Sequence, residues 1–161
     1  SEGYVQLPTK VTLDVEESVE NCTFNFDYVH FCPSVSYPLV KNCNFLPTSS
    51  NTGNITIEID PDGGGTLFNN AGPESASMSF NGCNFSSNTL FRIYFGTLTF
   101  NGGTIDFTNC LYDGQSLDNK DLLNQIIVGG QGQEVICING TPKYQTKYVD
   151  SDIVVVDYVA P

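Results

Sequence analysis

The chain has 161 residues, enough for one domain with a hydrophobic core of its own. Its 40% hydrophobic and 12% aromatic residues exclude an intrinsically disordered chain, and its six basic and 18 acidic residues give a formal net charge of −12. That charge repels nucleic acid and anionic lipid, and no apolar run reaches the roughly 18 residues of a membrane span, so neither a nucleic-acid partner nor membrane insertion is expected.

Strand patterns appear along most of the chain. Apolar residues alternate with polar ones in short runs, and clusters of Gly, Asn, Pro and Asp separate these runs, as turns require. The runs predict strands at 11–15, 55–59, 90–95, 98–100 and 152–159. The chain should therefore belong to the all-β class, with one short helix at most.

A short phrase returns along the first two thirds of the chain. Cys22, Cys43 and Cys83 open the similar stretches "CTF", "CNF" and "CNF", and Gly63 and Gly103 continue the same phase. The steps are 21, 20, 20 and 20 residues, so the period is about 20. A repeat of this length with strand patterns predicts stacked coils of short strands, each hydrogen-bonded to its equivalent one coil later. Cys and the Phe two places later should both point inward, because side-chain direction alternates along a strand.

Repeats of the form apolar-x-Asn-Cys-x-Phe occur as "VENCTF", "VKNCNF" and "FNGCNF", with "FTNCLY" at 107–112 as a second column. This pattern resembles the right-handed parallel β-helix of the pectin-lyase-like superfamily. The resemblance covers residues 15–112 and implies a single domain, 1–161, whose coils of about 20 residues occupy that range. The same fold carries pectinolytic enzymes, viral tailspikes, adhesins and capsid components, so the resemblance implies a fold more than an activity.

One stretch after the repeats has a helical pattern. The residues "SLDNKDLLNQII" at 116–127 predict a helix, with Asp118 as the N-cap and Asp121 three positions later. Gly129 and Gly130 should end it, because glycine disfavours the helical backbone.

The remainder of the C-terminal part keeps no clear repeat. The stretch "VICINGTPKY" predicts a hairpin that turns at Asn139-Gly140, and three successive valines in "IVVVDYV" predict a final strand buried on both faces. A stack of coils needs its end covered, because an open sheet edge pairs with other chains. Residues 113–161 are therefore predicted to be a capping or association segment.

The six cysteines divide into two groups. Stacked coils place column neighbours about 4.8 Å apart with parallel side chains, whereas a disulfide needs converging Cβ vectors. We therefore expect free, buried thiols at Cys22, Cys43 and Cys83. A disulfide stays open among the cysteines outside this column, which are Cys32, Cys110 and Cys137. Glycosylation also stays open at the four N-glycosylation motifs, which begin at Asn21, Asn54, Asn84 and Asn139.

The metal-binding candidates are Asp60 and Asp62 in "IDPDGGG". Two carboxylates in a Gly-rich turn suit calcium, together with free backbone carbonyls, although a simple turn explains the same residues. Calcium is the only cofactor that the sequence suggests, and zinc is not expected because the chain has a single His and no CxxC pair.

No residue is assigned a catalytic role. The sole histidine, His30, lies between apolar neighbours in "YVHFC", which favours a structural role, and Arg92, the only arginine, is either a solvated strand charge or a contact for a sugar carboxylate. Lys41 and Lys120 are the other candidate bases. A second acidic group contains Asp106, Asp113, Asp118 and Asp121.

These observations favour a non-enzymatic structural or attachment domain. The resemblance implies a viral tail or fibre component, or a surface adhesin, that recognises a glycan or protein receptor outside the cell or on the virion, and that assembles as a homo-oligomer such as a trimer. The alternative is a polysaccharide lyase or glycosidase with a carboxylate or calcium site. The enzyme is less favoured, since so short a chain leaves little room for a long substrate groove. A third hypothesis, for a coincidental repeat, is a β-sandwich adhesin.

Overall fold

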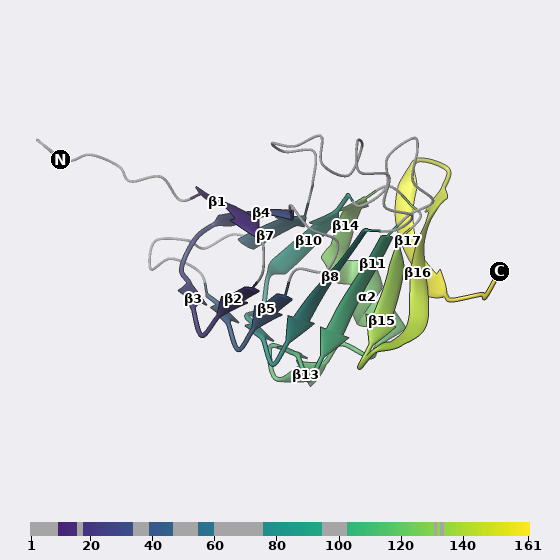
Figure 1. Ribbon diagram of the computed structural model, residues 1–161. Coiled ribbons are helices and arrows are strands. Elements are labelled where there is room, and N and C mark those ends of the chain that lie inside the picture. Colours follow the sequence, from purple (N-terminus) through teal and green to yellow (C-terminus); the bar gives the residue numbers. More distant parts are fainter. Residues whose placement is uncertain are drawn as a thin grey trace, which may run out of the picture.

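The structure is a computed structural model that describes residues 10–15, 18–33, 39–46, 55–59, 76–94, 103–130, 132 and 134–161. In these ranges the chain is mostly β-strand with one short helix, which confirms the predicted all-β class. The strands form three sheets, called A, B and C, around a common hydrophobic core (Figure 1).

Each sheet collects strands from separate parts of the chain, and within a sheet the strands are named in the order in which they hydrogen-bond. Sheet A contains β1 (Lys10–Val15), β4 (Tyr28–Pro33), β7 (Ile55–Ile59), β10 (Thr89–Ile93) and β14 (Ile127–Gly130). Sheet B contains β17 (Asp152–Asp157), β16 (Thr141–Val149), β15 (Val135–Ile138), β11 (Gly103–Thr108), β8 (Ala76–Asn81), β5 (Leu39–Lys41) and β2 (Ser18–Glu20). Sheet C contains β13 (Gln115–Ser116), β12 (Leu111–Tyr112), β9 (Asn84–Phe85), β6 (Asn44–Phe45) and β3 (Thr23–Phe24).

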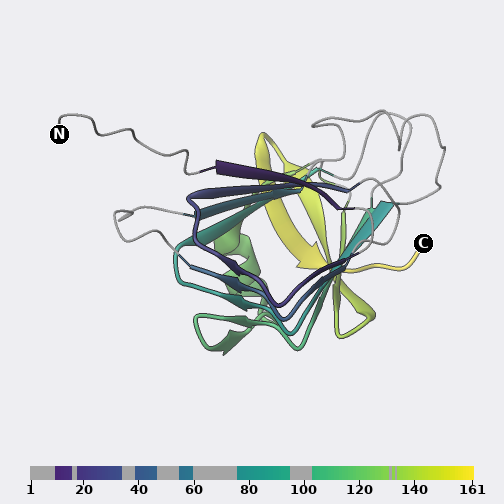
Figure 2. The same cartoon turned by 60° about the vertical axis from the view of Figure 1, so that its left-hand side comes forward.

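The chain visits the three sheets in a fixed order. From β1 to β12 it runs from sheet A to B to C and then returns to A, and each strand pairs in parallel with the strand of the next visit. In sheet A, for example, Val29 of β4 lies opposite Ile57 of β7. Figure 2 shows the successive strands of each sheet one behind another. Residues far apart in sequence therefore become neighbours across each sheet.

The predicted period of about 20 residues is wrong beyond the first step. In sheet B the register aligns Val19, Val40, Phe80 and Phe107, so equivalent residues are 21, 40 and 27 positions apart. The longer steps arise because the chain between strands varies in length while the strands keep their register. A connecting loop can lengthen at small entropic cost, so strand pairing does not require a constant period.

Two predicted repeats change place as a result. Gly103 does not continue the cysteine column, since it begins β11 and lies opposite Ala76 in sheet B. The stretch at 107–112, predicted as a second column, belongs to the first one, because Leu111 N donates a hydrogen bond to Cys83 O at 3.0 Å. Gly63 lies outside the described residues.

A left-handed residue makes the corner between sheets B and C. The four equivalent positions all have positive φ: Asn21 (57°), Asn42 (53°), Gly82 (68°) and Asn109 (51°). Asn and Gly tolerate this conformation best, which explains the Asn or Gly before each cysteine. Gly82 is also confined by its neighbour, because a Cβ at this position would lie 2.5 Å from Asn42 Oδ1.

The cysteine after each corner residue bonds to the backbone of its own corner. The Sγ atoms of Cys43 and Cys110 each lie 3.4 Å from the carbonyl oxygen two residues earlier, at Lys41 and Thr108. A small apolar side chain with a weak donor fits this position. The thiols of Cys22, Cys43, Cys83, Cys110 and Cys137 are all free. The expected free thiols are confirmed, although Cys22 is exposed rather than buried, and no disulfide joins Cys110 to Cys137.

Aromatic side chains fill the core in stacks that follow the strand register. Phe45 is fully buried, and its ring stacks on Phe24 and Phe85 with ring centres 5.0 and 5.1 Å apart. Phe31 and Phe80 approach the same ring edge-on. The predicted inward direction of the residue two places after each cysteine is therefore confirmed in sheet C, and Phe45 occupies the centre of the cluster.

The one described helix, α2 (Lys120–Ile126), is shorter than predicted and has a different cap. The side chain of Asn119, not Asp118, accepts the hydrogen bond from Leu122 N at 3.1 Å. Asp118 is instead held by the side chains of Lys143 and Tyr144. The chain leaves the helix directly into β14, whose last two residues are Gly129 and Gly130. The two glycines thus belong to a strand.

The predicted hairpin and final strand are present. Strands β15 and β16 pair antiparallel around Asn139 and Gly140, whose φ angles of 51° and 82° are those of a primed two-residue turn. Strand β17 is the last strand of sheet B, and of its three successive valines only Val155 is buried. The prediction of burial on both faces is wrong, because one face of this terminal strand lies toward solvent.

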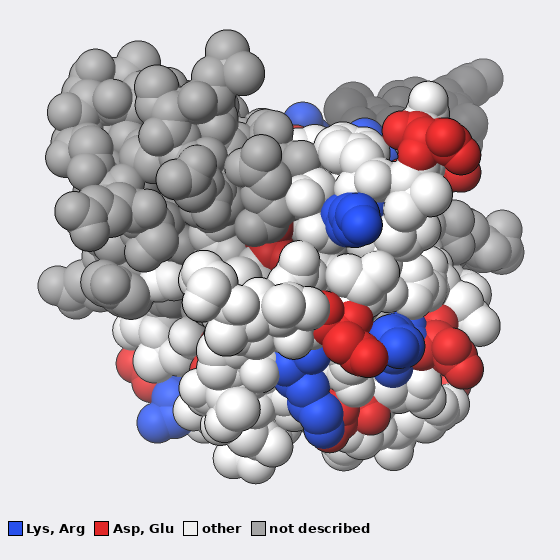
Figure 3. All heavy atoms as spheres, turned by 90° about the vertical axis from the view of Figure 1, so that its right-hand side faces the viewer, with Lys and Arg blue, Asp and Glu red and all other residues white. Residues whose placement is uncertain are grey.

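Helix α2 closes the edge of β17. The side-chain amide of Asn124 donates to Val155 O at 2.9 Å, and its oxygen accepts from Val155 N at 2.8 Å. Asn124 thereby bonds the strand as a neighbouring strand would. Beside it, Lys120 pairs with Asp157 at 3.2 Å. Figure 3 shows mixed acidic and basic side chains on this C-terminal end of the molecule, as expected for a solvated surface.

Candidate functional site

Polar side chains form a row across the outward face of sheet A. The register places His30 of β4 opposite Glu58 of β7, and Glu58 opposite Arg92 of β10. The residues that alternate with them on these strands are fully buried in the core: Val29, Phe31, Ile57, Ile59, Phe91 and Ile93. Because side chains alternate across a strand, His30, Glu58 and Arg92 all point away from that core.

Glu58 is the centre of this row. Its Oε1 accepts a hydrogen bond of 2.5 Å from Tyr28 Oη, and its Oε2 lies 3.6 Å from His30 Nε2. The same Oε1 lies 3.8 Å from Arg92 Nε on the other side. One carboxylate therefore joins side chains from three adjacent strands.

Arg92 extends the row toward β14. Its Nη2 donates to Tyr94 Oη at 2.7 Å, and its guanidinium carbon lies 5.7 Å from the centre of the Tyr94 ring. The next strand presents Gly129 opposite Arg92, where a Cβ would lie only 2.9 Å from Tyr94 Oη. The absent side chain leaves room for Arg92 and Tyr94 beside the backbone of β14. At the opposite end of the row, Lys10 Nζ lies 4.7 Å from the centre of the Tyr28 ring.

The row is shielded at its centre and open at its Arg92 end. His30 is 8% exposed and the Glu58 side chain 17% exposed, whereas the Arg92 side chain is 44% exposed. A carboxylate with so little contact with water needs charged or hydrogen-bonding partners, and Glu58 has them. The arrangement holds Arg92 and Tyr94 in place at the surface, where they can contact a ligand.

Burial and the hydrogen bond to Glu58 raise the pKa of Tyr28 well above its ordinary value. Both effects favour the neutral phenol, because a phenolate would be poorly hydrated and would face the Glu58 carboxylate. Tyr28 is therefore a hydrogen-bond donor at neutral pH, and it is unsuited to abstracting a proton.

This raised pKa predicts how the stability contribution of Tyr28 depends on pH. Since the folded-state pKa lies above the unfolded value of about 10, the contribution is complete below pH 10 and is lost as the pH rises through the folded-state value. Tyr28→Phe should lower the free energy of unfolding by about 1–3 kcal/mol at pH 8, and by less above pH 10. Urea unfolding of both proteins at several pH values measures this, and a difference that is independent of pH would contradict it.

The predicted metal site cannot be placed, because Asp60 and Asp62 lie outside the described residues. The second acidic group is divided by the fold. Asp106 accepts from Thr108 Oγ1 and from Gly140 N, both at 3.0 Å, whereas Asp118 binds the capping segment, where the hydrogen bonds from Lys143 and Tyr144 lower its pKa. Within the described ranges, no group of three His, Cys, Asp or Glu side chains is arranged to hold a metal ion.

The sequence named His30 and Arg92 separately but missed Glu58, Tyr28 and Tyr94. The strand pattern of "ITIEID" places Glu58 on an outward face, as the structure confirms. The missing information was which strands are neighbours: 28 residues separate His30 from Glu58 and 34 separate Glu58 from Arg92, steps that the expected period does not contain.

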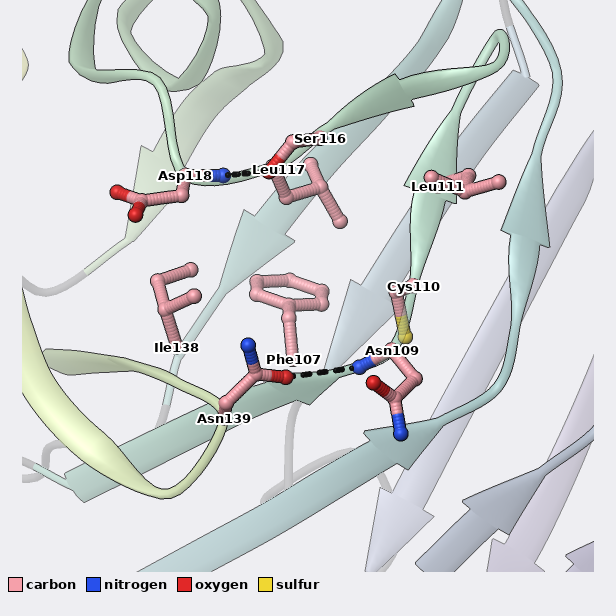
Figure 4. A pocket seen from close by; sticks show the side chains of 9 residues that line it. All are labelled: Phe107, Asn109, Cys110, Leu111, Ser116, Leu117, Asp118, Ile138 and Asn139. Carbon is pink, nitrogen blue, oxygen red and sulfur yellow. Dashed lines mark hydrogen bonds between the residues drawn. The ribbon is translucent and has the colours of Figure 1, made fainter.

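A second hollow lies at the corner between the β12–β13 hairpin and the turn of β15 and β16 (Figure 4). It measures about 370 Å³. Its polar groups bond one another: Asn139 Oδ1 accepts from Asn109 N at 3.0 Å, and Ser116 Oγ accepts from Asp118 N at 3.1 Å. What remains for a ligand is mostly an apolar floor, so the row on sheet A is the stronger candidate site. The other lining residues are Phe107, Cys110, Leu111, Leu117 and Ile138.

Comparisons with protein-family models, with curated proteins and with solved structures find no match to this chain. Among the described residues, no helix combines the length and the apolar character that crossing a membrane requires. The function must therefore be argued from the fold and from the row on sheet A.

Proposed function

We propose that this chain is a right-handed parallel β-helix domain with a structural or attachment role, and that it binds a glycan through the outward row on sheet A. The observation that carries the proposal is the network around Glu58, which fixes Arg92 and Tyr94 at the surface. Such a domain would act outside the cell or on a virion surface, as part of a tail, fibre or adhesin.

The fixed order in which the chain visits the three sheets supports the β-helix. Parallel pairing of each strand with the equivalent strand of the next visit is the arrangement expected of stacked coils. The stacked rings of Phe24, Phe45 and Phe85 are the core counterpart of that arrangement. Unequal steps between coils are compatible with it, since only the strands must align.

The chemistry of the row supports a sugar ligand. Sugar hydroxyl groups both donate and accept hydrogen bonds, and their C–H faces pack on aromatic rings. Arg92 supplies donors and Tyr94 supplies an aromatic ring at the exposed end of the row. A rigid sheet holds both in position before binding, which reduces the entropic cost of association.

Assembly as a trimer or another homo-oligomer is part of the proposal, since a fibre or spike requires subunits to associate. The closed edge of β17 supports contacts through the outward sheet faces rather than through strand addition at the C-terminal end. Sedimentation equilibrium of the purified chain tests this point independently of any ligand.

The alternative is a polysaccharide lyase or glycosidase. A glycosidase needs two carboxyl groups about 5–9.5 Å apart, and within the described side chains only Glu58 supplies a carboxylate to this network. A lyase needs a proton-abstracting base, a role for which the raised pKa of Tyr28 is unfavourable. Binding without turnover is therefore the better supported function.

The decisive experiment incubates the protein with acidic and neutral polysaccharides, with and without calcium, and scores both retention of protein and new chain ends. We expect retention without new ends, and at least tenfold weaker retention of Arg92→Ala. Lys147→Ala is the matched control, because it removes the same charge from an exposed residue of β16.

Three results would overturn the proposal. New chain ends would make the protein an enzyme, and their loss in a variant with Asp60→Asn and Asp62→Asn would assign the predicted calcium site to catalysis. Retention that is equal in Arg92→Ala and the native chain would move the binding site away from sheet A. Failure to retain any polysaccharide would leave a scaffold with a protein partner.

A further inference from the structure

We infer that the row on sheet A selects an uncharged sugar and rejects sugars that carry a carboxylate. This inference rests on the proposed function, since it assumes that the row binds a glycan. It concerns the role of Glu58, which lies beside the exposed cation of the row and is positioned by two other strands.

The exposed end of the row has no net charge. Glu58 Oε1 lies 3.8 Å from Arg92 Nε, so a carboxylate that approached Arg92 would also approach a fixed negative charge. At such distances two like charges near a protein surface repel by several kcal/mol. The same pairing leaves Arg92 its hydrogen-bond donors, which an uncharged hydroxyl group can use.

The other cation of the row is too distant to offset Glu58. Lys10 lies on β1, and β4 and β7 separate this strand from β10, which carries Arg92. At about 4.8 Å per strand, the separation is about 14 Å, beyond the roughly 8 Å screening length at physiological ionic strength. The other charged group of the row, His30, faces Glu58 rather than the exposed end.

The side-on fork of Arg92 is also occupied. A guanidinium binds a carboxylate most strongly through two parallel N–H groups, and Nε with Nη2 forms one such pair. Nε faces Glu58, and Nη2 donates to Tyr94 Oη at 2.7 Å. The paired recognition that favours an acidic sugar is thus used within the protein. In addition, the net charge of −12 repels a polyanion at longer range.

The test compares two polymers with one backbone: a polyuronate, and the same polymer after its carboxyl groups have been reduced to alcohols. We expect the native chain to be retained at least tenfold more strongly by the reduced, uncharged polymer. Raising the salt concentration should narrow this preference, because salt screens repulsion of the polyuronate and leaves hydrogen bonds to a neutral sugar in place.

Glu58→Gln tests the assigned residue, because it keeps the shape of the side chain and removes its charge. The preference should move at least tenfold toward the polyuronate. Glu20→Gln is the control, since it makes the same change of net charge at an exposed residue of β2 in sheet B, and it should leave the preference unchanged. Near-UV circular dichroism establishes that both variants are folded.

The outcomes separate this inference from the proposed function. A native chain retained more strongly by the polyuronate overturns the inference while leaving glycan binding intact. A native preference for the neutral polymer that Glu58→Gln and Glu20→Gln alter equally shows that net charge rules, and overturns the role of Glu58. Retention by neither polymer, nor by any other glycan, overturns the proposed function and the inference with it.

Discussion

Replacing Phe45 by Ala should lower the free energy of unfolding by about 3–5 kcal/mol. Its ring is fully buried between Phe24 and Phe85, and Phe31 and Phe80 contact it edge-on, so truncation leaves a cavity that four neighbouring rings cannot close. The loss is a large fraction of the roughly 5–15 kcal/mol typical of a whole domain. Equilibrium unfolding in urea, followed by far-UV circular dichroism, measures it.

Phe45→Leu provides the control for this experiment. It keeps most of the buried volume and removes only the stacking, so it should cost clearly less than the alanine variant. Equal losses in the two variants would show that this position can repack freely. The stack would then contribute little specificity to the core.

Gly82→Ala should lower the free energy of unfolding by about 2–4 kcal/mol, a large effect for adding one methyl group. Two causes combine. An L-residue at a φ of 68° costs about 1–2 kcal/mol, and the new Cβ would lie 2.5 Å from Asn42 Oδ1, so the Asn42 side chain must move. The same urea experiment measures the loss.

Gly114→Ala separates these two causes. Gly114 has a similar φ of 76°, but a Cβ there meets no atom within 4 Å. Its substitution should therefore cost only about 1–2 kcal/mol, the conformational part of the effect. If Gly82→Ala proved no more harmful than Gly114→Ala, contact between successive corners would not matter to stability.

The local features of the fold were predictable because each answers a local physical requirement. Alternation identified β7 and β10, the Asn-Gly pair identified the turn at 139–140, and Asn or Gly before Cys reflects the positive φ of each corner. The spacing of the coils was not predictable. A loop that connects two strands can grow without changing their register, so the distance from Cys43 to its next stacked equivalent, Cys83, is about twice the distance from Cys22 to Cys43.

The row on sheet A was only partly predictable for the same reason. His30 and Arg92 stood out as the only residues of their kinds, but Glu58 is one of 18 acidic residues, and nothing in its local sequence connects it to either. Its role depends on parallel pairing between β4, β7 and β10, which are separated by long connections. Long-range register, rather than composition, assembles this network.

The contact between Asn124 and Val155 bears on the fate of the protein at high concentration. A β-rich chain with exposed backbone at a sheet edge is a template on which further chains can add, as they do in amyloid growth. Because both backbone groups of Val155 already bond Asn124, an incoming chain must displace an internal partner before it gains a bond. The C-terminal end should therefore slow templated fibril growth, and this protection costs the fold no additional strand.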